Sequence, residues 1–326
     1  MPVPQGLLDF IREGESFLVA GHKEPDGDCV GSQLALGELL GRLGKKATLV
    51  SAGPWKRAEV ALFQKRFTDA VGGYDPQNTR LLVVDCSSLE RTGGLAEVLA
   101  AFPVAFIDHH QTAGLSELCY LNPAAPAAAV LVLALWEAFE MPLTLDAAEY
   151  LLFGLCTDTG FFRHIDEGGA ATLADTQKLV AAGANLKKTF AAINGGRTLN
   201  SRKLLGTILA KAESWYGGRL IVSTEELEES ERFGRESRDS DMLYQLLQSV
   251  DGVEAIAIVR QDTPEECALG FRSKSDVDVA KIAAAFGGGG HKNAAGAHTA
   301  GTVADLKLRV IEQFRTCLPT NTGIQR

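Results

Sequence analysis

The sequence predicts an α/β protein of two domains, the first of them built on a parallel sheet. Short apolar runs of strand length alternate with helical stretches through the first half of the chain, and strand–helix–strand units of this kind form parallel sheets. At 326 residues the chain is long enough for about two domains. The alternation breaks near residue 193, and a different order of elements after it indicates a second, smaller α/β domain.

The first domain begins with a predicted strand at residues 17–20, followed by the glycine-containing loop GHKEPDGDCVGS. We expect an amphipathic helix from Gln33 to about Leu43, because leucines recur there at helical spacing. The strand at 81–84 ends in Asp85-Cys86-Ser87, and the strand at 104–107 ends in Asp108-His109-His110. The other predicted elements are a strand at 47–50 and helices at 94–101, 124–139, 172–182 and from Asp146, as N-cap, to Leu155.

The domain boundary is expected in a linker at residues 193–205, between a first domain at 1–192 and a second at 206–326. The second domain is predicted to hold strands at 220–222, 253–259 and 268–271 and helices at 242–249 and 303–314. The charge-dense segment 225–241 is predicted to be a solvated loop or helix. Four consecutive glycines precede His291, and we expect a helix of small residues after that histidine.

The composition is that of an ordinary globular protein, with 46% hydrophobic and 22% charged residues. The formal net charge of −9 argues against a protein that coats long duplexes, because phosphate affinity depends on many Lys and Arg contacts. Six scattered cysteines without a C-x-x-C pair favour neither a zinc ribbon nor a disulfide framework, so a reducing cytoplasm is the expected setting. The N-terminus lacks the pattern of a signal peptide, and no apolar run approaches the ~18 residues of a membrane span.

Polar side chains gather at the ends of the predicted strands and helices. Those able to bind a metal are His22, Asp26, Asp28, Asp85, His109 and Asp158. Open α/β sheets bind ligands at the carboxyl ends of their strands, which meet at one edge. Four carboxylates in one pocket would repel one another, and two divalent cations would offset their charge. Because carboxylates and imidazoles suit Mn²⁺ or Mg²⁺, the sequence predicts a two-metal centre of the kind that activates water against phosphorus.

In order along the chain, these motifs resemble those of the DHH phosphoesterase superfamily. HKEPDGDCVGS is similar to the motif H-x-x-P-D-G-D-x-x-G-S, Asp85 matches the second motif, Asp108-His109-His110 the third, and CTDTGFFR the fourth. FGGGGHKNAAG resembles the signature of the associated DHHA1 domain. The resemblance runs from about residue 15 to 315 and is greatest to the bacterial oligoribonuclease (nanoRNase) and 3′-phosphoadenosine-5′-phosphate (pAp) phosphatase subgroup. It implies a parallel-sheet DHH catalytic domain, a smaller α/β DHHA1 domain and a cleft between them.

Carried over residue by residue, the resemblance implies two Mn²⁺ ions per active site, with Mg²⁺ or Co²⁺ as alternatives. His22, Asp26 and Asp85 would hold the first ion, and Asp28, Asp85, His109 and Asp158 the second, with Asp85 bridging. His110 would lie beside the scissile phosphate, and Asp108 would orient a histidine. The residues expected to bind the substrate are Arg272, Ser273, Gly288, Gly289, Gly290 and His291.

The implied reaction is hydrolysis of short oligoribonucleotides to 5′-mononucleotides, of pAp to AMP and phosphate, or both, without action on long duplexes or at membranes. A homodimer is a further hypothesis. A linear or cyclic dinucleotide phosphodiesterase is the alternative within the enzyme class, and a non-catalytic nucleotide-binding regulator is the alternative outside it. A family II inorganic pyrophosphatase shares the first four motifs, but the GGGGH segment argues against it.

Two segments depart from the family pattern, QTAG at 111–114 and PAAPAAAV at 123–130, and leave the preferred substrate open.

Overall fold

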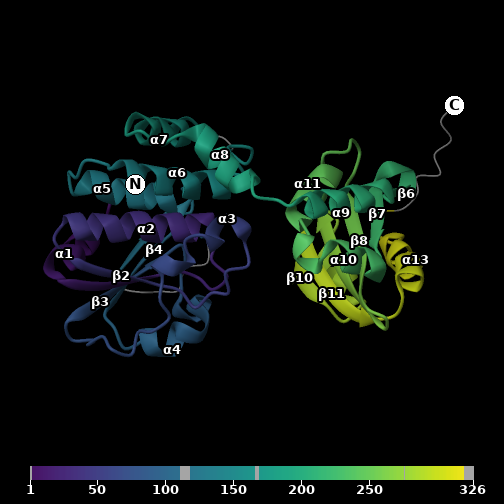
Figure 1. Cartoon of the computed structure of the whole chain (residues 1–326), viewed down its shortest axis with the longest axis horizontal. Coiled ribbons are helices and arrows are strands. Elements are labelled where there is room, and N and C mark those ends of the chain that lie inside the picture. The colour runs from purple at the N-terminus through teal and green to yellow at the C-terminus, as the bar shows by residue number, and fades with distance from the viewer. Residues whose placement is uncertain (1, 111–117, 166–168, 275, 319–326) are drawn as a thin grey trace. The chain divides into compact units, whose positions relative to one another are not determined.

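The computed structural model describes residues 2–110, 118–165, 169–274 and 276–318, so the QTAG departure at 111–114 lies outside the described residues. The chain divides into two compact units, Met1–Gly196 and Arg197–Arg326. Unit 1 runs from purple to teal in Figure 1, and unit 2 runs from green to yellow. A parallel sheet in unit 1 and a mixed sheet in unit 2 confirm the predicted α/β class with two unlike domains.

The described residues of unit 1 form a sheet of five strands, β1 Ser16–Ala20, β2 Lys46–Val50, β3 Thr79–Val84, β4 Val104–Asp108 and β5 Cys119–Leu121. Their order in the sheet is β2-β1-β3-β4-β5, and every neighbouring pair is parallel. After β1 the chain forms β2 on one side of it and then returns to form β3 on the other side. The winding therefore reverses between β1 and β3, and open α/β sheets bind ligands beside such a reversal, at the carboxyl ends of the strands.

Helices cover both faces of this sheet, because successive strand residues point to opposite sides. The helices of unit 1 are α1 Gln5–Glu13, α2 Gly27–Arg42, α3 Ala58–Ala61, α4 Ala96–Leu99, α5 Ala128–Ala138, α6 Leu145–Asp158, α7 Gly169–Ala181 and α8 Leu186–Asn194, with 3₁₀ turns η1 Gln64–Arg66 and η2 Leu89–Leu95. Phe17 and Val19 of β1 pack into a core with α1, α2, α5 and α6, while Leu18 and Ala20 face α4. Figure 1 shows α4 on the side of the sheet opposite α2, α5 and α6.

Several helix starts differ from the sequence-based expectation, and capping residues explain two of the differences. Helix α2 begins at Gly27 rather than Gln33, because the Asp26 carboxylate accepts a hydrogen bond from the Cys29 N–H at 3.1 Å and caps it. The prediction that Asp146 caps α6 was wrong. Thr144 is the N-cap, with its hydroxyl accepting from the Ala147 N–H at 3.0 Å, and Asp146 lies in the first turn.

Helices α2 and α6 approach closely because glycines lie where they meet. A Cβ atom at Gly31 would lie 2.3 Å from the Tyr150 carbonyl oxygen, and one at Gly27 would lie 2.2 Å from Thr157 Oγ1. This close contact brings the first turn of α2 against the last turn of α6. Those two turns carry predicted metal ligands that lie far apart in the sequence.

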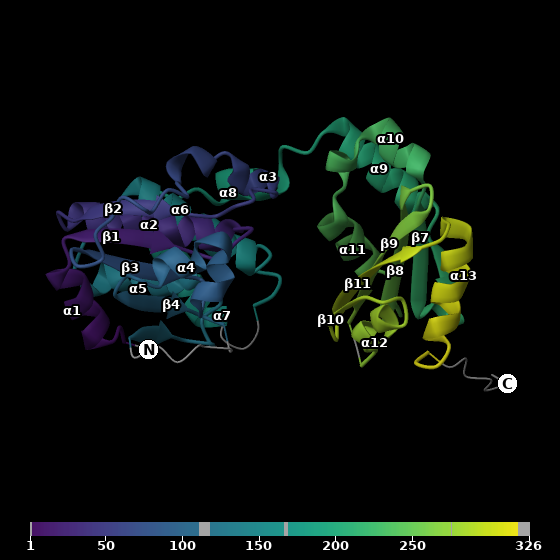
Figure 2. The same cartoon turned by 90° about the horizontal axis from the view of Figure 1, so that it is seen from below.

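Unit 2 is built on a second sheet of strand order β10-β11-β9-β8-β7-β6. Its strands are β6 Glu213–Trp215, β7 Leu220–Glu225, β8 Ala255–Thr263, β9 Glu266–Ser273, β10 Gly289–His291 and β11 Ala294–Ala300. Its helices are α9 Leu199–Ala210, α10 Leu227–Phe233, α11 Ser240–Gln248, α12 Val279–Ala284 and α13 Val303–Phe314, with 3₁₀ turns η3 Tyr216–Gly218 and η4 Arg235–Ser237. Helices α12 and α13 pack on one face of the sheet and α9 and α11 on the other, as Figure 2 shows for α13 and α9.

Two expectations for unit 2 were wrong. The segment 225–241 is not uniformly solvated, because Glu225 is fully buried and forms ion pairs with Arg238 at 2.7 Å and Arg260 at 3.0 Å. The small residues after His291 form strand β11 rather than a helix, since a short hairpin turn joins them to β10. Within the described residues, none of the helices combines the length and the apolar character needed to cross a membrane.

Candidate metal centre

All six predicted metal ligands come together in unit 1 at the carboxyl edge of its sheet. His22 follows β1, Asp85 follows β3, and His109 follows β4. Helix α2 supplies Asp26 at its N-cap and Asp28 in its first turn, and α6 ends in Asp158. The sheet topology and the α2–α6 contact thus converge on one cluster.

The cluster consists of two groups that share Asp85. In the first group, His22 Nε2 lies 3.4 Å from Asp85 Oδ2 and 3.7 Å from Asp26 Oδ1. In the second group, His109 Nε2 lies 3.3 Å from Asp85 Oδ1 and 3.2 Å from Asp158 Oδ2. The same His109 nitrogen lies 3.9 Å from Asp28 Oδ2. One oxygen of Asp85 therefore faces each group.

Asp85 adopts a backbone conformation that residues other than glycine rarely take. Its φ angle is +57°, in the left-handed region, and the side chain is almost fully buried. Its Oδ1 atom has no hydrogen-bond donor among the described residues. A strained backbone and an unpaired buried oxygen are both costly, and such features concentrate at functional sites.

Backbone carbonyls fix the orientation of the two histidines. His22 Nδ1 lies 2.8 Å from the Lys23 carbonyl oxygen, and His109 Nδ1 lies 3.2 Å from that of Ala125. In each ring the carbonyl favours a proton on Nδ1, which leaves Nε2 as the atom that faces the carboxylates. His109 Nε2 is buried and makes no hydrogen bond of acceptable geometry with the described residues. Once Nε2 has lost its proton, imidazole nitrogens beside carboxylates are a donor set that fits divalent cations.

The Asp28 carboxylate is held by the start of α5. Its Oδ2 accepts a hydrogen bond from the Ala128 N–H at 2.6 Å, and its Oδ1 accepts from the Ala129 N–H at 2.9 Å. Ser32 Oγ donates to Oδ1 at 3.1 Å. Sequence reasoning missed this role of the alanine-rich segment, because backbone N–H groups leave no mark in residue identity. The segment departs from the family pattern in its side chains, yet it contacts the cluster through its backbone.

Asp108 organises the loop that follows β4. Its Oδ1 accepts hydrogen bonds from the backbone N–H of His109 at 2.8 Å and from His110 Nδ1 at 2.8 Å. Burial raises the pKa of Asp108, but the hydrogen bond and charge of His110 outweigh it and lower the pKa overall. An ionised Asp108 thus holds the proton of His110 on Nδ1, and the half-exposed ring can present Nε2 elsewhere.

The electrostatics of the cluster show that it favours added positive charge. Burial and the nearby charges of Asp85 and Asp158 raise the pKa of Asp28, and burial likewise raises that of Asp158. Burial lowers the pKa of His109, but its interactions with Asp158 and Asp85 outweigh burial and raise it to about 11. Protons therefore accumulate where carboxylates crowd together. The chemistry of the residues and the unpaired atoms both fit divalent cations.

Cys29 also lies within this cluster. Its sulfur, a His22 nitrogen and an Asp85 oxygen lie within 4.8 Å of one another. Burial raises the pKa of the thiol to about 12, and Sγ donates to Gln33 Oε1 at 3.4 Å. A neutral thiol is a poor metal ligand, and the six predicted ligands do not include Cys29.

The residues predicted to bind substrate lie in unit 2. His291 on β10 pairs with Ala294 on β11, which pairs in turn with Arg272 on β9, so the three form one row across the sheet. Residues paired in this way project to the same face, and the alanine between them is small. The Arg272 guanidinium carbon lies 4.6 Å from the centre of the Tyr244 ring.

Some of the other residues predicted to bind substrate, Ser273 and glycines of the run before His291, also have structural roles within unit 2. Ser273 is buried, and its Oγ donates to the Val277 carbonyl oxygen at 2.7 Å. A Cβ at Gly288 would lie 2.1 Å from the Gly296 carbonyl oxygen, whereas Gly289 has open space. Close packing of β10 on β11 therefore accounts for part of the glycine run. Substrate contacts from Ser273, Gly288, Gly289 and Gly290 stay predictions.

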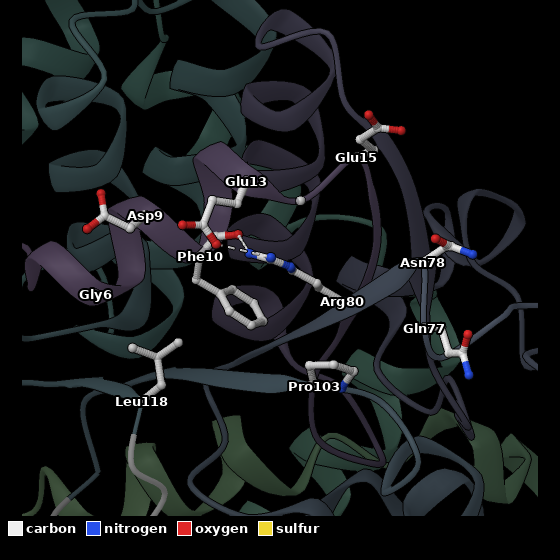
Figure 3. Close-up of a pocket in the computed structure, with 11 residues that line it drawn as sticks. Gly6, Asp9, Phe10, Glu13, Glu15, Gln77, Asn78, Arg80, Pro103 and Leu118 are labelled. Atoms are coloured by element: carbon white, nitrogen blue, oxygen red, sulfur yellow. Dashed lines mark hydrogen bonds and ion pairs between the residues drawn. The ribbon is translucent and has the colours of Figure 1, made fainter.

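A cavity of about 590 Å³ lies at the opposite, amino-terminal edge of the unit 1 sheet (Figure 3). Arg80 crosses it and donates to the Phe10 carbonyl oxygen, while its Nη2 pairs with Glu13 at 3.3 Å. The guanidinium carbon also lies 4.8 Å from the centre of the Phe10 ring. Arg80 thus fastens α1 to β3, and we assign no ligand to this cavity.

Two family profiles match the chain. That of the DHH family, N-terminal domain, covers residues 16–155, and that of the DHHA1 domain covers residues 217–316. The first range includes five of the six clustered residues and ends just before Asp158. The second includes the row formed by Arg272, Ala294 and His291.

Whole-chain relatives extend this match. The bifunctional oligoribonuclease and PAP phosphatase NrnA of Thermus thermophilus is 31% identical over 299 residues, which are 91% of this chain and 88% of that protein. The probable bifunctional oligoribonuclease and PAP phosphatase NrnA of Streptococcus mutans is 25% identical, covering 90% of this chain and 92% of its own. Among solved structures, an exopolyphosphatase-related protein from Bacteroides fragilis has the same fold, with a TM-score of 0.80 at 20% identity over 96% of each chain.

Proposed function

Because the chain belongs to the DHH family and carries a DHHA1 domain, we propose that it is a two-metal phosphoesterase. Its proposed substrates are short oligoribonucleotides, hydrolysed to 5′-mononucleotides, and pAp, hydrolysed to AMP and phosphate. The names of the Thermus and Streptococcus relatives support these two substrates. The observation that carries the proposal is the position of Asp85, whose two carboxylate oxygens each face a separate group of ligands.

The proposed ligands follow the two groups. His22, Asp26 and Asp85 would hold one ion, and Asp28, Asp85, His109 and Asp158 would hold the other. Mn²⁺ is the proposed ion, with Mg²⁺ or Co²⁺ as alternatives, since the donors are carboxylate oxygens and imidazole nitrogens. When bound, such a pair of ions neutralises phosphate charge and lowers the pKa of a water molecule.

The chain's own residues supply positioning and proton transfer. Asp108 accepts the Nδ1 proton of His110 and so orients the ring. The Nε2 atom of His110 can then exchange a proton with a phosphate oxygen or with the leaving oxygen. In unit 2, Arg272 can bind phosphate through two N–H groups, and the exposed His291 lies in the same row.

The alternatives share most of these features. A dinucleotide phosphodiesterase would use the same metal chemistry, so only the substrate distinguishes it. A non-catalytic nucleotide-binding regulator is less well supported, because all six predicted ligands are present and converge.

The cytoplasm remains the proposed location, consistent with six cysteines that are all free thiols.

The test is a substrate panel with product chromatography. The purified chain would be incubated with Mn²⁺ and pAp, a dinucleotide, a pentaribonucleotide, a cyclic dinucleotide or a long duplex. We expect mononucleotides from the short oligoribonucleotides and AMP from pAp, with the duplex left intact. Turnover of the cyclic dinucleotide alone would favour a dinucleotide phosphodiesterase. Binding of nucleotides without any turnover would favour a non-catalytic regulator.

A further inference from the structure

The segment that follows β2 concentrates positive charge and aromatic rings in an acidic chain. Residues 54–67, PWKRAEVALFQKRF, contain four basic residues, one acidic residue and three aromatic residues, whereas the whole chain carries a formal charge of −9. The segment includes α3 and η1 and lies shortly after the end of β2 at Val50. Basic and aromatic residues side by side are the combination that binds single-stranded nucleic acid.

A cavity of about 680 Å³ lies beside this segment, and we call it the Trp55 pocket. Trp55, Gln64, Lys65 and Phe67 are among the residues that line it. The rings of Trp55 and Phe67 contact each other with centroids 4.9 Å apart and an angle of 56° between their planes. A volume of this size lies within the range of small-molecule sites, about 300–1,000 Å³, and can hold a nucleotide.

The Trp55 pocket adjoins the loop that carries the first metal ligands. Gly53 lines the pocket, and its carbonyl oxygen accepts a hydrogen bond from the Glu24 N–H at 2.9 Å. Glu24 lies between His22 and Asp26 in the sequence. Because β2 pairs in parallel with β1, the chain after β2 emerges at the same edge of the sheet as this loop.

The cations of the segment divide into two kinds. Lys56 pairs with Glu24 at 2.6 Å, and Arg66 donates to the Tyr150 hydroxyl at 3.3 Å, so both have protein partners. The side chains of Lys65 and Arg57 are exposed and form neither an ion pair nor a hydrogen bond within the described parts of the chain. Lys65 therefore offers an unpaired charge at the wall of a pocket that also presents an indole ring.

Packing explains only part of this arrangement. Phe63 and Phe67 contact a small core that includes Val30 and Leu34, so burial accounts for these two rings. Trp55 packs against the same core but stays partly exposed at the pocket wall. A structural cap would need neither a partly exposed tryptophan nor an unpaired lysine beside it.

We propose that the Trp55 pocket binds one nucleotide of a short single-stranded oligonucleotide, at a position other than the scissile phosphate. This inference rests on the proposed function and adds a basis for preferring longer substrates. The base would stack on Trp55, the Gln64 amide would contact the edge of the base, and Lys65 would pair with a phosphate. A mononucleotide such as pAp would not need the pocket.

The experiment compares substrates of different length in the full chain. Trp55→Leu and Lys65→Ala are assayed on a pentaribonucleotide and on pAp. Trp55→Phe retains a stacking surface, and Lys46→Ala removes an exposed lysine at the opposite end of β2 as a matched control. We expect Trp55→Leu to lower kcat/KM on the pentaribonucleotide about tenfold or more, mainly through KM, because base stacking on an aromatic ring contributes substantially. Lys65→Ala should act in the same direction, and both should leave pAp turnover unchanged.

Three outcomes would overturn the proposal: an equal loss on both substrates, no loss on the pentaribonucleotide, or the same loss in Lys46→Ala. Binding of a fluorescently labelled pentaribonucleotide in EDTA, where metal-dependent hydrolysis stops, tests the pocket without relying on turnover. If the wild type hydrolysed neither substrate yet bound the oligonucleotide in a Trp55-dependent way, the proposed function would fail and the pocket would stand. If the wild type hydrolysed both substrates and Trp55→Leu bound the oligonucleotide as tightly as the wild type, the proposed function would stand and the pocket proposal would fail.

Discussion

The Asp28 carboxylate accepts a 2.6 Å hydrogen bond from the backbone N–H of Ala128, a residue one hundred positions further along the chain. This contact joins the first turn of α2 to the start of α5 and fixes one carboxylate of the metal cluster. It is made by the backbone of a segment whose side chains are methyl groups. What this contact requires of residue 128 is a backbone nitrogen that carries a hydrogen.

Ala128→Pro removes that N–H and should weaken metal binding at the second group. Proline is tolerated at the first position of a helix, and Ala127 before it is already extended, at φ −167° and ψ 153°. Hydrogen bonds to charged groups contribute about 1.5–3 kcal/mol, so we expect metal affinity to fall about tenfold or more. Titration calorimetry with Mn²⁺ would measure this, and Ala128→Gly, which keeps the N–H, serves as the control. Unchanged affinity in a folded proline variant would show that this contact is dispensable.

Asp85→Asn should abolish turnover and reduce bound metal at both groups. Asparagine has the same shape and tolerates the left-handed backbone at this position, so the variant should stay folded. Losing one negative charge also relieves repulsion in the metal-free cluster. Metal analysis and turnover would be measured together, with Asp251→Asn, an exposed carboxylate in unit 2, as the control. Two bound metals with near-normal turnover would contradict the bridging role.

Metal binding should release protons, and its affinity should rise with pH. The pKa of His109 is about 11 in the metal-free cluster, so at pH 7 its ring carries a proton that must leave before Nε2 can bind a cation. The raised pKa values of Asp28 and Asp158 act in the same direction. Calorimetry in two buffers of different ionisation enthalpy counts the protons released. An affinity that is constant between pH 6 and pH 9 would rule this out.

Tyr244→Leu should weaken substrate binding through Arg272 without affecting metal. The Arg272 guanidinium lies over the Tyr244 ring, and a cation–π contact of this kind contributes about 0.5–2 kcal/mol, which is roughly a 2- to 30-fold effect. We expect KM for a dinucleotide to rise within that range, with metal content and turnover of a small chromogenic diester unchanged. Tyr244→Phe keeps the ring and should resemble the wild type. Arg272→Ala should show the same pattern more strongly, and loss of bound metal in either variant would assign Arg272 to the metal centre instead.

Much of the fold and of the centre could be predicted from the sequence because both depend on local patterns. The apolar runs that became β1, β3 and β4 are followed within two residues by His22, Asp85 and His109, and strand ends meet at one edge in any parallel sheet. Glycines and capping residues are also local signals. The capping signal led to a wrong prediction at Asp146, because Thr144, two residues earlier, is the N-cap of α6.

The remaining features arise from contacts between distant segments, which residue identity does not encode. Glycines 27 and 31 let α2 approach α6 and so bring Asp28 toward Asp158, and the alanine-rich segment contributes through its backbone N–H groups. The buried charge of Glu225 is stable only because Arg238 and Arg260 reach it from other elements. The sequence by itself determined which residues could hold metal and in what type of sheet. The resemblance implied that Asp85 bridges two ions, but only the tertiary structure showed that each of its oxygens faces a separate group, because that depends on the side-by-side placement of β1, β3 and β4 in space.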